Sequence, residues 1–204
     1  APATAPGAAS PVANAVVADT RPQELADLCN ILHYSGHADK AVALVQPYLS
    51  LLDRQPELVL AYVNASVTAQ RSDEAYAVLK HIDEAGQMVA ALYPPYVKLV
   101  LAREDVALAE GIASKLDPAT FNEEQALAVI ETARAHPAPS VLSVLTARFG
   151  AEPVVADKPV LAAVIALLTA DKAQDTKIEA ALNAQLTESQ RVSLAEACAR
   201  ANKT

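Results

Sequence analysis

The sequence contains no tryptophan, only five glycines and only two cysteines among 204 residues. Aromatic residues make up 4% of the chain, so the aromatic and β-branched runs that strands prefer are scarce. Alanine and straight side chains, which favour helix, dominate instead. With 52% hydrophobic residues, the chain has enough apolar surface to bury a continuous core. These features predict an all-α protein.

Basic clusters and long apolar runs are also missing. The net charge is −8, and basic residues such as Arg71, Lys80 and Lys98 are scattered singly. Because no basic stripe is available to follow a phosphate backbone, we expect no nucleic-acid partner. The longest apolar run, Val160 to Ala170, is about half of the roughly 20 residues that a bilayer span requires. We therefore expect a buried helix there and no transmembrane segment.

Motifs of catalysis and cofactor binding are absent too. The chain has no nucleophile elbow, no phosphate-binding glycine loop and no Gly-x-Gly-x-x-Gly. His33 and His37 are four residues apart, but Gly36 should end a helix between them, so they need not share a face as metal ligands must. The acidic pairs Asp83-Glu84 and Glu123-Glu124 lie at expected helix ends and are interpreted as caps or solvated faces. The sequence predicts a protein that is not an enzyme, with no catalytic residue, metal or cofactor.

The two cysteines lie in the first and last expected helices. Cys29 and Cys198 are too far apart in sequence to form a metal-ligand pair. We interpret them as small core residues, since free cysteine is often buried. The alternative is a disulfide, which requires the two ends of the chain to meet.

Residues 1–19 differ in composition from the rest. They are rich in Ala, Pro, Ser and Gly and carry no charge before Asp19, which is typical of an extended tail or linker. Small residues at the start are also what remains after cleavage by a signal peptidase. We therefore expect a periplasmic or otherwise exported protein, with a boundary inside a longer polypeptide as the alternative.

One helical pattern occurs twice, at an offset of 34 residues. The segments PQELADLCNILHYSGHADKAVALV, from Pro22, and PELVLAYVNASVTAQRSDEAYAVL, from Pro56, keep their apolar positions in step. Apolar residues recur in each at three- and four-residue intervals in two stretches separated by a polar break, which predicts two amphipathic helices in a hairpin. Ala41 and Ala75, early in the second helix of each pair, permit close packing of the backbones.

The two segments resemble tetratricopeptide repeats, whose 34-residue units are helical hairpins. The turn, the acidic residue and the close-packed alanine carry the resemblance, in SGHADKAVALV and QRSDEAYAVL, and it covers residues 22–86. The segments depart from the consensus at Leu25 and Val59, where an aromatic residue is expected, and at Cys29 and Val63, where glycine is expected. The resemblance implies an α-solenoid, a right-handed superhelical stack of antiparallel hairpins.

After Gly86 the sequence shows no recognisable 34-residue unit, although helical patterns continue. We expect about eleven helices in all, including one that begins at Tyr96 after Pro94-Pro95. Capping boxes are expected at Thr120 with Glu123 and at Thr187 with Gln190. The domain prediction is a tail at 1–19, two repeats at 20–86, and degenerate hairpins with a C-terminal cap at 87–204 that continue the same array.

In such a stack the first helix of each hairpin lines a concave groove. Asparagine side chains there can pair with the backbone of an extended peptide, because the amide carries both a donor and an acceptor. The alternative is that these asparagines are ordinary exposed helix residues, and the convex surface is equally open as a binding face. The resemblance assigns to the groove Gln23, Asn30, His33 and Tyr34 from the first unit and Glu57, Leu60, Asn64, Val67 and Thr68 from the second.

The expected function is therefore that of a protein-binding module. We expect a tetratricopeptide-like adaptor or an accessory subunit of a larger assembly, in the bacterial envelope or associated with a membrane. One alternative is a cytoplasmic export chaperone with a similar repeat layout. Another is the helical scaffold of a larger enzyme, resembling the superhelix of lytic transglycosylases.

Overall fold

Residues 21–201 are described by the computed structural model, so the tail expected at 1–19 lies outside the described residues. Residues 21–201 contain twelve α-helices and three short 3-10 segments, and no strand. The prediction of an all-α protein is confirmed. About eleven helices were expected, and the additional one is the short α10 (Glu152–Val155).

The chain divides into two compact units, Ala1–Gln87 and Met88–Thr204. In unit 1, α2 packs on α3, α4 packs on α5, and both α2 and α3 contact α4. The segments that begin at Pro22 and Pro56 are therefore two successive hairpins packed on each other, as predicted. The elements of unit 1 are α2 (Pro22–Tyr34), α3 (Ala38–Val45), the 3-10 segment η1 (Gln46–Arg54), α4 (Pro56–Thr68) and α5 (Ser72–Glu84).

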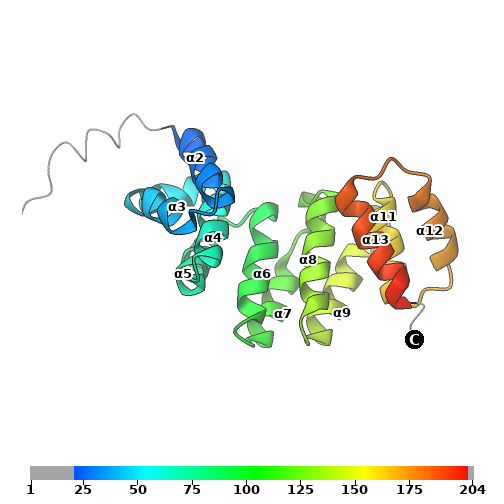
Figure 1. The fold of residues 1–204 in the computed structure, drawn as a ribbon. Coiled ribbons are helices and arrows are strands. Elements are labelled where there is room, and N and C mark those ends of the chain that lie inside the picture. Colours follow the sequence, from blue (N-terminus) through cyan, green and yellow to red (C-terminus); the bar gives the residue numbers. More distant parts are fainter. Residues whose placement is uncertain (1–20, 202–204) are drawn as a thin grey trace, which may run out of the picture. The chain divides into compact units, whose positions relative to one another are not determined.

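Unit 2 begins with two more hairpins, α6 with α7 and α8 with α9. Helices α6, α8 and α13 lie side by side along one face of the unit (Figure 1). Pro94 and Pro95 lie in the first turn of α6, which begins at Tyr93 and not at the predicted Tyr96. The bounds are η2 (Ala90–Leu92), α6 (Tyr93–Leu101), α7 (Val106–Lys115), η3 (Pro118–Thr120), α8 (Glu123–Ala135), α9 (Pro139–Phe149), α10, α11 (Pro159–Leu168), α12 (Gln174–Leu182) and α13 (Glu188–Ala201).

The helix starts keep a 34-residue spacing beyond Gly86, where the sequence pattern indicated no such unit. Helices α3, α5, α7, α9 and α12 begin at residues 38, 72, 106, 139 and 174, which are 34, 34, 33 and 35 residues apart. A residue with positive φ follows the first helix of three successive pairs, at Gly36, Gln70 and Glu104. Because the residue type changes while the left-handed conformation recurs, the third turn carries no glycine signal in the sequence.

Alanine marks the close contact within these hairpins. Ala41, Ala75 and Ala109 each occupy the fourth position of a second helix, and all three are fully buried. Across the first of these contacts, the Sγ atom of Cys29 lies 3.8 Å from the carbonyl oxygen of Ala41. A larger side chain at these positions has no space unless the helices separate.

Helix α11 is the most apolar element and lies inside unit 2. It contacts α8, α9, α12 and α13, and most of its side chains, from Val160 to Ala166, are buried. This confirms the prediction that the apolar run is covered by neighbouring helices. No helix among the described residues is long and apolar enough to cross a bilayer.

The carboxylate of Glu123 ties three helices together. Its Oε1 atom accepts hydrogen bonds from the backbone N–H groups of Val160, at 2.8 Å, and Leu161, at 2.9 Å, at the start of α11. Its Oε2 atom accepts one from Nε2 of Gln190 on α13, at 2.6 Å. Glu123 was expected to be a cap or a solvated residue, and it caps a helix other than its own.

One of the two predicted capping boxes is wrong, and the other is correct. The box at the start of α8 uses Asn122 and Gln125, because Glu123 is bonded to α11 and Thr120 donates its hydroxyl to the carbonyl of Asp117. The box before α13 is formed as predicted: the side chain of Gln190 accepts from the N–H of Thr187, and the hydroxyl of Thr187 accepts from the N–H of Gln190.

We predict that Ala75→Leu destabilises the chain by about 1–3 kcal/mol, because it adds a branched side chain to a fully buried helix contact. Ala77→Leu is the matched control, since Ala77 is exposed on the same helix, and it should change stability by about 0.5 kcal/mol or less. Urea unfolding followed by far-ultraviolet circular dichroism measures both. Equal midpoints for the two variants would show that Ala75 is not at a close contact.

We predict that Glu123→Ala lowers the free energy of unfolding by about 1–3 kcal/mol, because two helix N–H groups and the Gln190 amide lose a charged acceptor. Glu124→Ala is the control: Glu124 is exposed and accepts one hydrogen bond, from Thr187, so its loss should cost less than about 1 kcal/mol. The same urea titration compares them, and a larger effect at Glu124 would contradict the role given to Glu123.

Candidate functional site

The residues assigned to the groove lie on α2 and α4, two helices that pack directly against each other. None of them is fully buried. Asn30 and Asn64 are half-buried, and neither side chain has a hydrogen-bond partner among the described residues. Gln23, Tyr34, Glu57 and Thr68 are exposed, whereas His33, Leu60 and Val67 are half-buried.

The 34-residue spacing carries the asparagine position into unit 2. The residues in step with Asn30 and Asn64 are Lys98 on α6 and Thr132 on α8. Both line one cavity of unit 2, which sequence reasoning missed because it did not extend the offset past Gly86. Applying the same spacing to α6 and α8 is the signal that finds it.

That cavity, here called the charged pocket, has a volume of about 320 Å³. It opens where α6, α8 and α13 meet, on the face where these three helices lie side by side (Figure 1). Its lining consists of Lys98 from α6, Glu131, Thr132, Arg134 and Ala135 from α8, His136 just after α8, and Glu196 and Arg200 from α13.

Arg134 is the buried member of the pocket, with 7% of its side chain exposed. Its Nη2 group donates to the carboxylate of Glu131 and, at 3.0 Å, to Oε2 of Glu196. The same oxygen of Glu196 lies 3.6 Å from Nη2 of Arg200. The Nε and Nη1 groups of Arg134 and the Oε1 atom of Glu131 are buried without a hydrogen-bond partner.

The charges of the pocket do not balance. Lys98, Arg134 and Arg200 are cationic, whereas only Glu131 and Glu196 supply carboxylates. Burial raises the pKa of Glu131 even though Arg134 beside it acts in the opposite direction. Lys98 has no ion-pair partner among the described residues. The Nδ1 atom of His136 lies 2.8 Å from the carbonyl oxygen of Thr132, so this nitrogen carries the proton that is donated.

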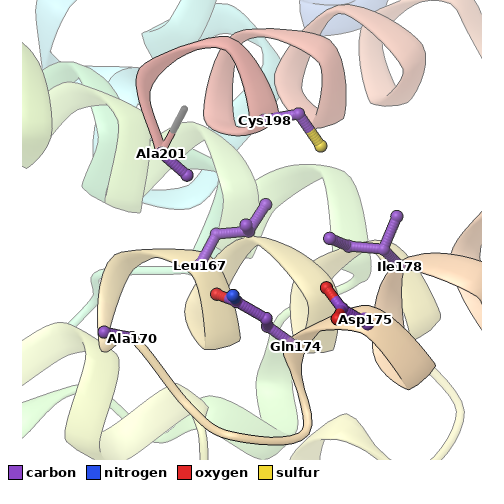
Figure 2. Close-up of a pocket in the computed structure, with 7 residues that line it drawn as sticks. All are labelled: Leu167, Ala170, Gln174, Asp175, Ile178, Cys198 and Ala201. Atoms are coloured by element: carbon purple, nitrogen blue, oxygen red, sulfur yellow. The ribbon is translucent and has the colours of Figure 1, made fainter. Parts of the chain in front are cut away.

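A second cavity of about 320 Å³ lies between α12 and α13, over the end of α11. Figure 2 shows the side chains of Leu167 and Ile178 on the side of Cys198, which projects from α13. Its other lining residues are Ala170, Gln174, Asp175 and Ala201. The wall is mainly apolar, with one carboxylate and one thiol.

The cysteines have different environments, and both are free. Cys29 is fully buried, as predicted, and burial raises the pKa of its thiol to about 11. Cys198 is half-buried at the cavity of Figure 2, so it is not the core residue that was expected. Sequence spacing contained no information on this difference, because the exposure of Cys198 depends on how α12 and α13 are separated.

The two neighbouring histidines belong to different elements. His33 lies in the last turn of α2, Gly36 has a φ of +79° beyond it, and His37 is the residue before α3. Within residues 21–201, no three side chains of His, Cys, Asp or Glu are grouped closely enough to hold a metal ion.

No family model, curated protein or solved structure matches this chain. The resemblance to tetratricopeptide repeats therefore rests on the residues of the chain itself and on the spacing of its helices.

We predict that a thiol reagent modifies Cys198 in the folded chain and leaves Cys29 unmodified near pH 8. Cys29 is enclosed, and its raised pKa keeps it protonated there, whereas the thiolate is the reactive form. Counting modified thiols by mass spectrometry should give one site in buffer and two in denaturant. Modification of Cys29 in buffer, at a rate matching Cys198, would contradict the packing of α2 on α3.

Proposed function

We propose that this chain is a non-enzymatic protein–protein interaction module built from tetratricopeptide-like hairpins. The observation that carries the proposal is the recurrence of helix starts at about 34-residue intervals from α3 to α12. Each unit has first helices in the same register, and each places polar side chains at the corresponding position of those helices. In step, these residues are Asn30, Asn64, Lys98 and Thr132.

The chemistry of these positions supports binding rather than turnover. An amide side chain offers a donor and an acceptor, which match the C=O and N–H groups of an extended peptide. Asn30 and Asn64 have these groups unpaired and partly exposed on neighbouring helices of unit 1. Their preorganisation on two packed helices lowers the entropy lost when a peptide binds.

The proposed role is that of an adaptor or an accessory subunit, which holds a segment of another protein. We place this role in an assembly of the bacterial envelope, in keeping with the composition of residues 1–19. The unpaired asparagines and the concave arrangement that the resemblance implies favour the first helices as the contact surface.

We predict that a photo-crosslinking amino acid at Thr68 captures a partner protein in the native cell, whereas the same group at Ala77 captures none. Both positions are exposed in the same hairpin, Thr68 on the first helix and Ala77 on the second. Replacing Asn30 and Asn64 with alanine should reduce the Thr68 adduct about tenfold, because two hydrogen bonds to the partner are lost. Adducts are identified by mass spectrometry.

Adducts at Ala77 alone would assign binding to the second helices and overturn the groove. A steady-state turnover that disappears when one side chain of this chain is replaced would overturn the interaction module as a whole.

A further inference from the structure

The charged pocket contains a cation that its neighbours compensate incompletely. Arg134 uses one nitrogen, Nη2, for both of its carboxylate partners, and its two other donor groups are buried without acceptors. Glu196 is shared with Arg200, so a single carboxylate serves two guanidinium groups. A guanidinium group stays charged in proteins, and burial without full pairing is costly.

The positive charges also flank the opening on both sides. Lys98 is exposed on α6, and Arg200 is exposed on α13, while Arg134 lies on α8 between them. Helix α8 contacts both α6 and α13, so the three side chains converge from three adjacent helices. An anion that enters the pocket meets Lys98 and Arg200 first and lies above the buried charge of Arg134.

The net charge selects the kind of anion. Three cationic side chains face two carboxylates, which leaves one positive charge for a ligand to compensate. A carboxylate carries one negative charge and accepts hydrogen bonds from both ammonium and guanidinium groups. A phosphate dianion would exceed that charge and would be repelled by Glu131 and Glu196 at short range. A volume of about 320 Å³ accommodates an acidic side chain and little more.

We propose that the charged pocket binds a carboxylate group, supplied by an aspartate or glutamate side chain of the partner protein. Lys98 and Arg200 contact the carboxylate, and Arg134 is a positioning residue that adds positive charge from beneath. This identity of the ligand's source rests on the proposed function, because it takes the bound molecule to be a protein. The pocket is in step with Asn64, so it extends the proposed contact positions into unit 2.

The test measures binding of labelled peptides to the full chain by fluorescence anisotropy at low salt. The first peptide contains two internal glutamates and has an amidated C-terminus. The second replaces both glutamates with glutamine and has a free C-terminal carboxylate. The third has glutamine and an amidated C-terminus, and succinate serves as a competitor. The first peptide should bind, the third should not, and succinate should displace the first.

Variants then locate the site. Lys98→Ala and Arg200→Ala should each weaken binding of the first peptide about five- to tenfold, because each removes one charge-assisted hydrogen bond. Lys115→Ala is the matched control, since it removes the same charge from an exposed position of the same unit. Its effect should be less than about twofold, and circular dichroism checks that all three variants are folded.

The outcomes separate the claims. Equal losses in Lys98→Ala and Lys115→Ala would indicate attraction by overall charge and would overturn the site. Binding of the second peptide but not the first would assign the pocket to a chain-terminal carboxylate and overturn the acidic side chain as the source. If Thr68 captures a partner while no carboxylate probe binds, the interaction module stands and the pocket proposal fails. If only succinate binds and Thr68 captures nothing, the pocket takes a small acid and the proposed function fails.

Discussion

The structure depends on the burial of apolar stripes that a single hairpin cannot cover. Helix α4 shows this most clearly, because α2 and α3 cover one side of it and α5 packs on another. Tyr62 and Ala65 of α4 are 1% and 0% exposed, whereas the residues 34 positions earlier on α2, Leu28 and Ile31, are 45% and 61% exposed. The difference between these matched pairs is the presence of a preceding hairpin, so neighbour contacts supply much of the burial that stabilises each unit.

Polar ties align the helices once the apolar stripes have brought them together. Glu123 accepts two N–H groups from the start of α11, where a helix has donors with no intrahelical acceptor. Arg148 on α9 provides the complementary service at the end of α7, where its guanidinium donates to the carbonyl of Leu116, with Nε at 3.1 Å. Since both bonds join helix ends to neighbouring helices, they favour one axial alignment over others that would bury similar apolar area.

The same packing creates the unusual charge of the pocket. Arg134 lies on α8, and its burial follows from the contacts of α8 with α6 and α13. Replacing it with an apolar residue would avoid the cost of a partly paired buried charge. A chain selected for stability alone has no need of that arrangement, whereas a chain that binds an anionic group gains a field from it. The pocket therefore combines a structural cost with a binding chemistry, on the helices where the repeat register places polar residues.

The sequence by itself determined the helices, the two hairpins that begin at Pro22 and Pro56, the burial of α11 and the capping box at Thr187, because these follow from periodicity and from local turn and cap chemistry. Only the tertiary structure decided that Glu123 caps a helix 37 residues away, that Cys198 borders a cavity, and that Lys98, Arg134 and Arg200 converge. Those features depend on which helices become neighbours across long stretches of chain. A lysine on an amphipathic helix has the same local pattern whether it faces solvent or a pocket, and the adjoining helix makes the difference.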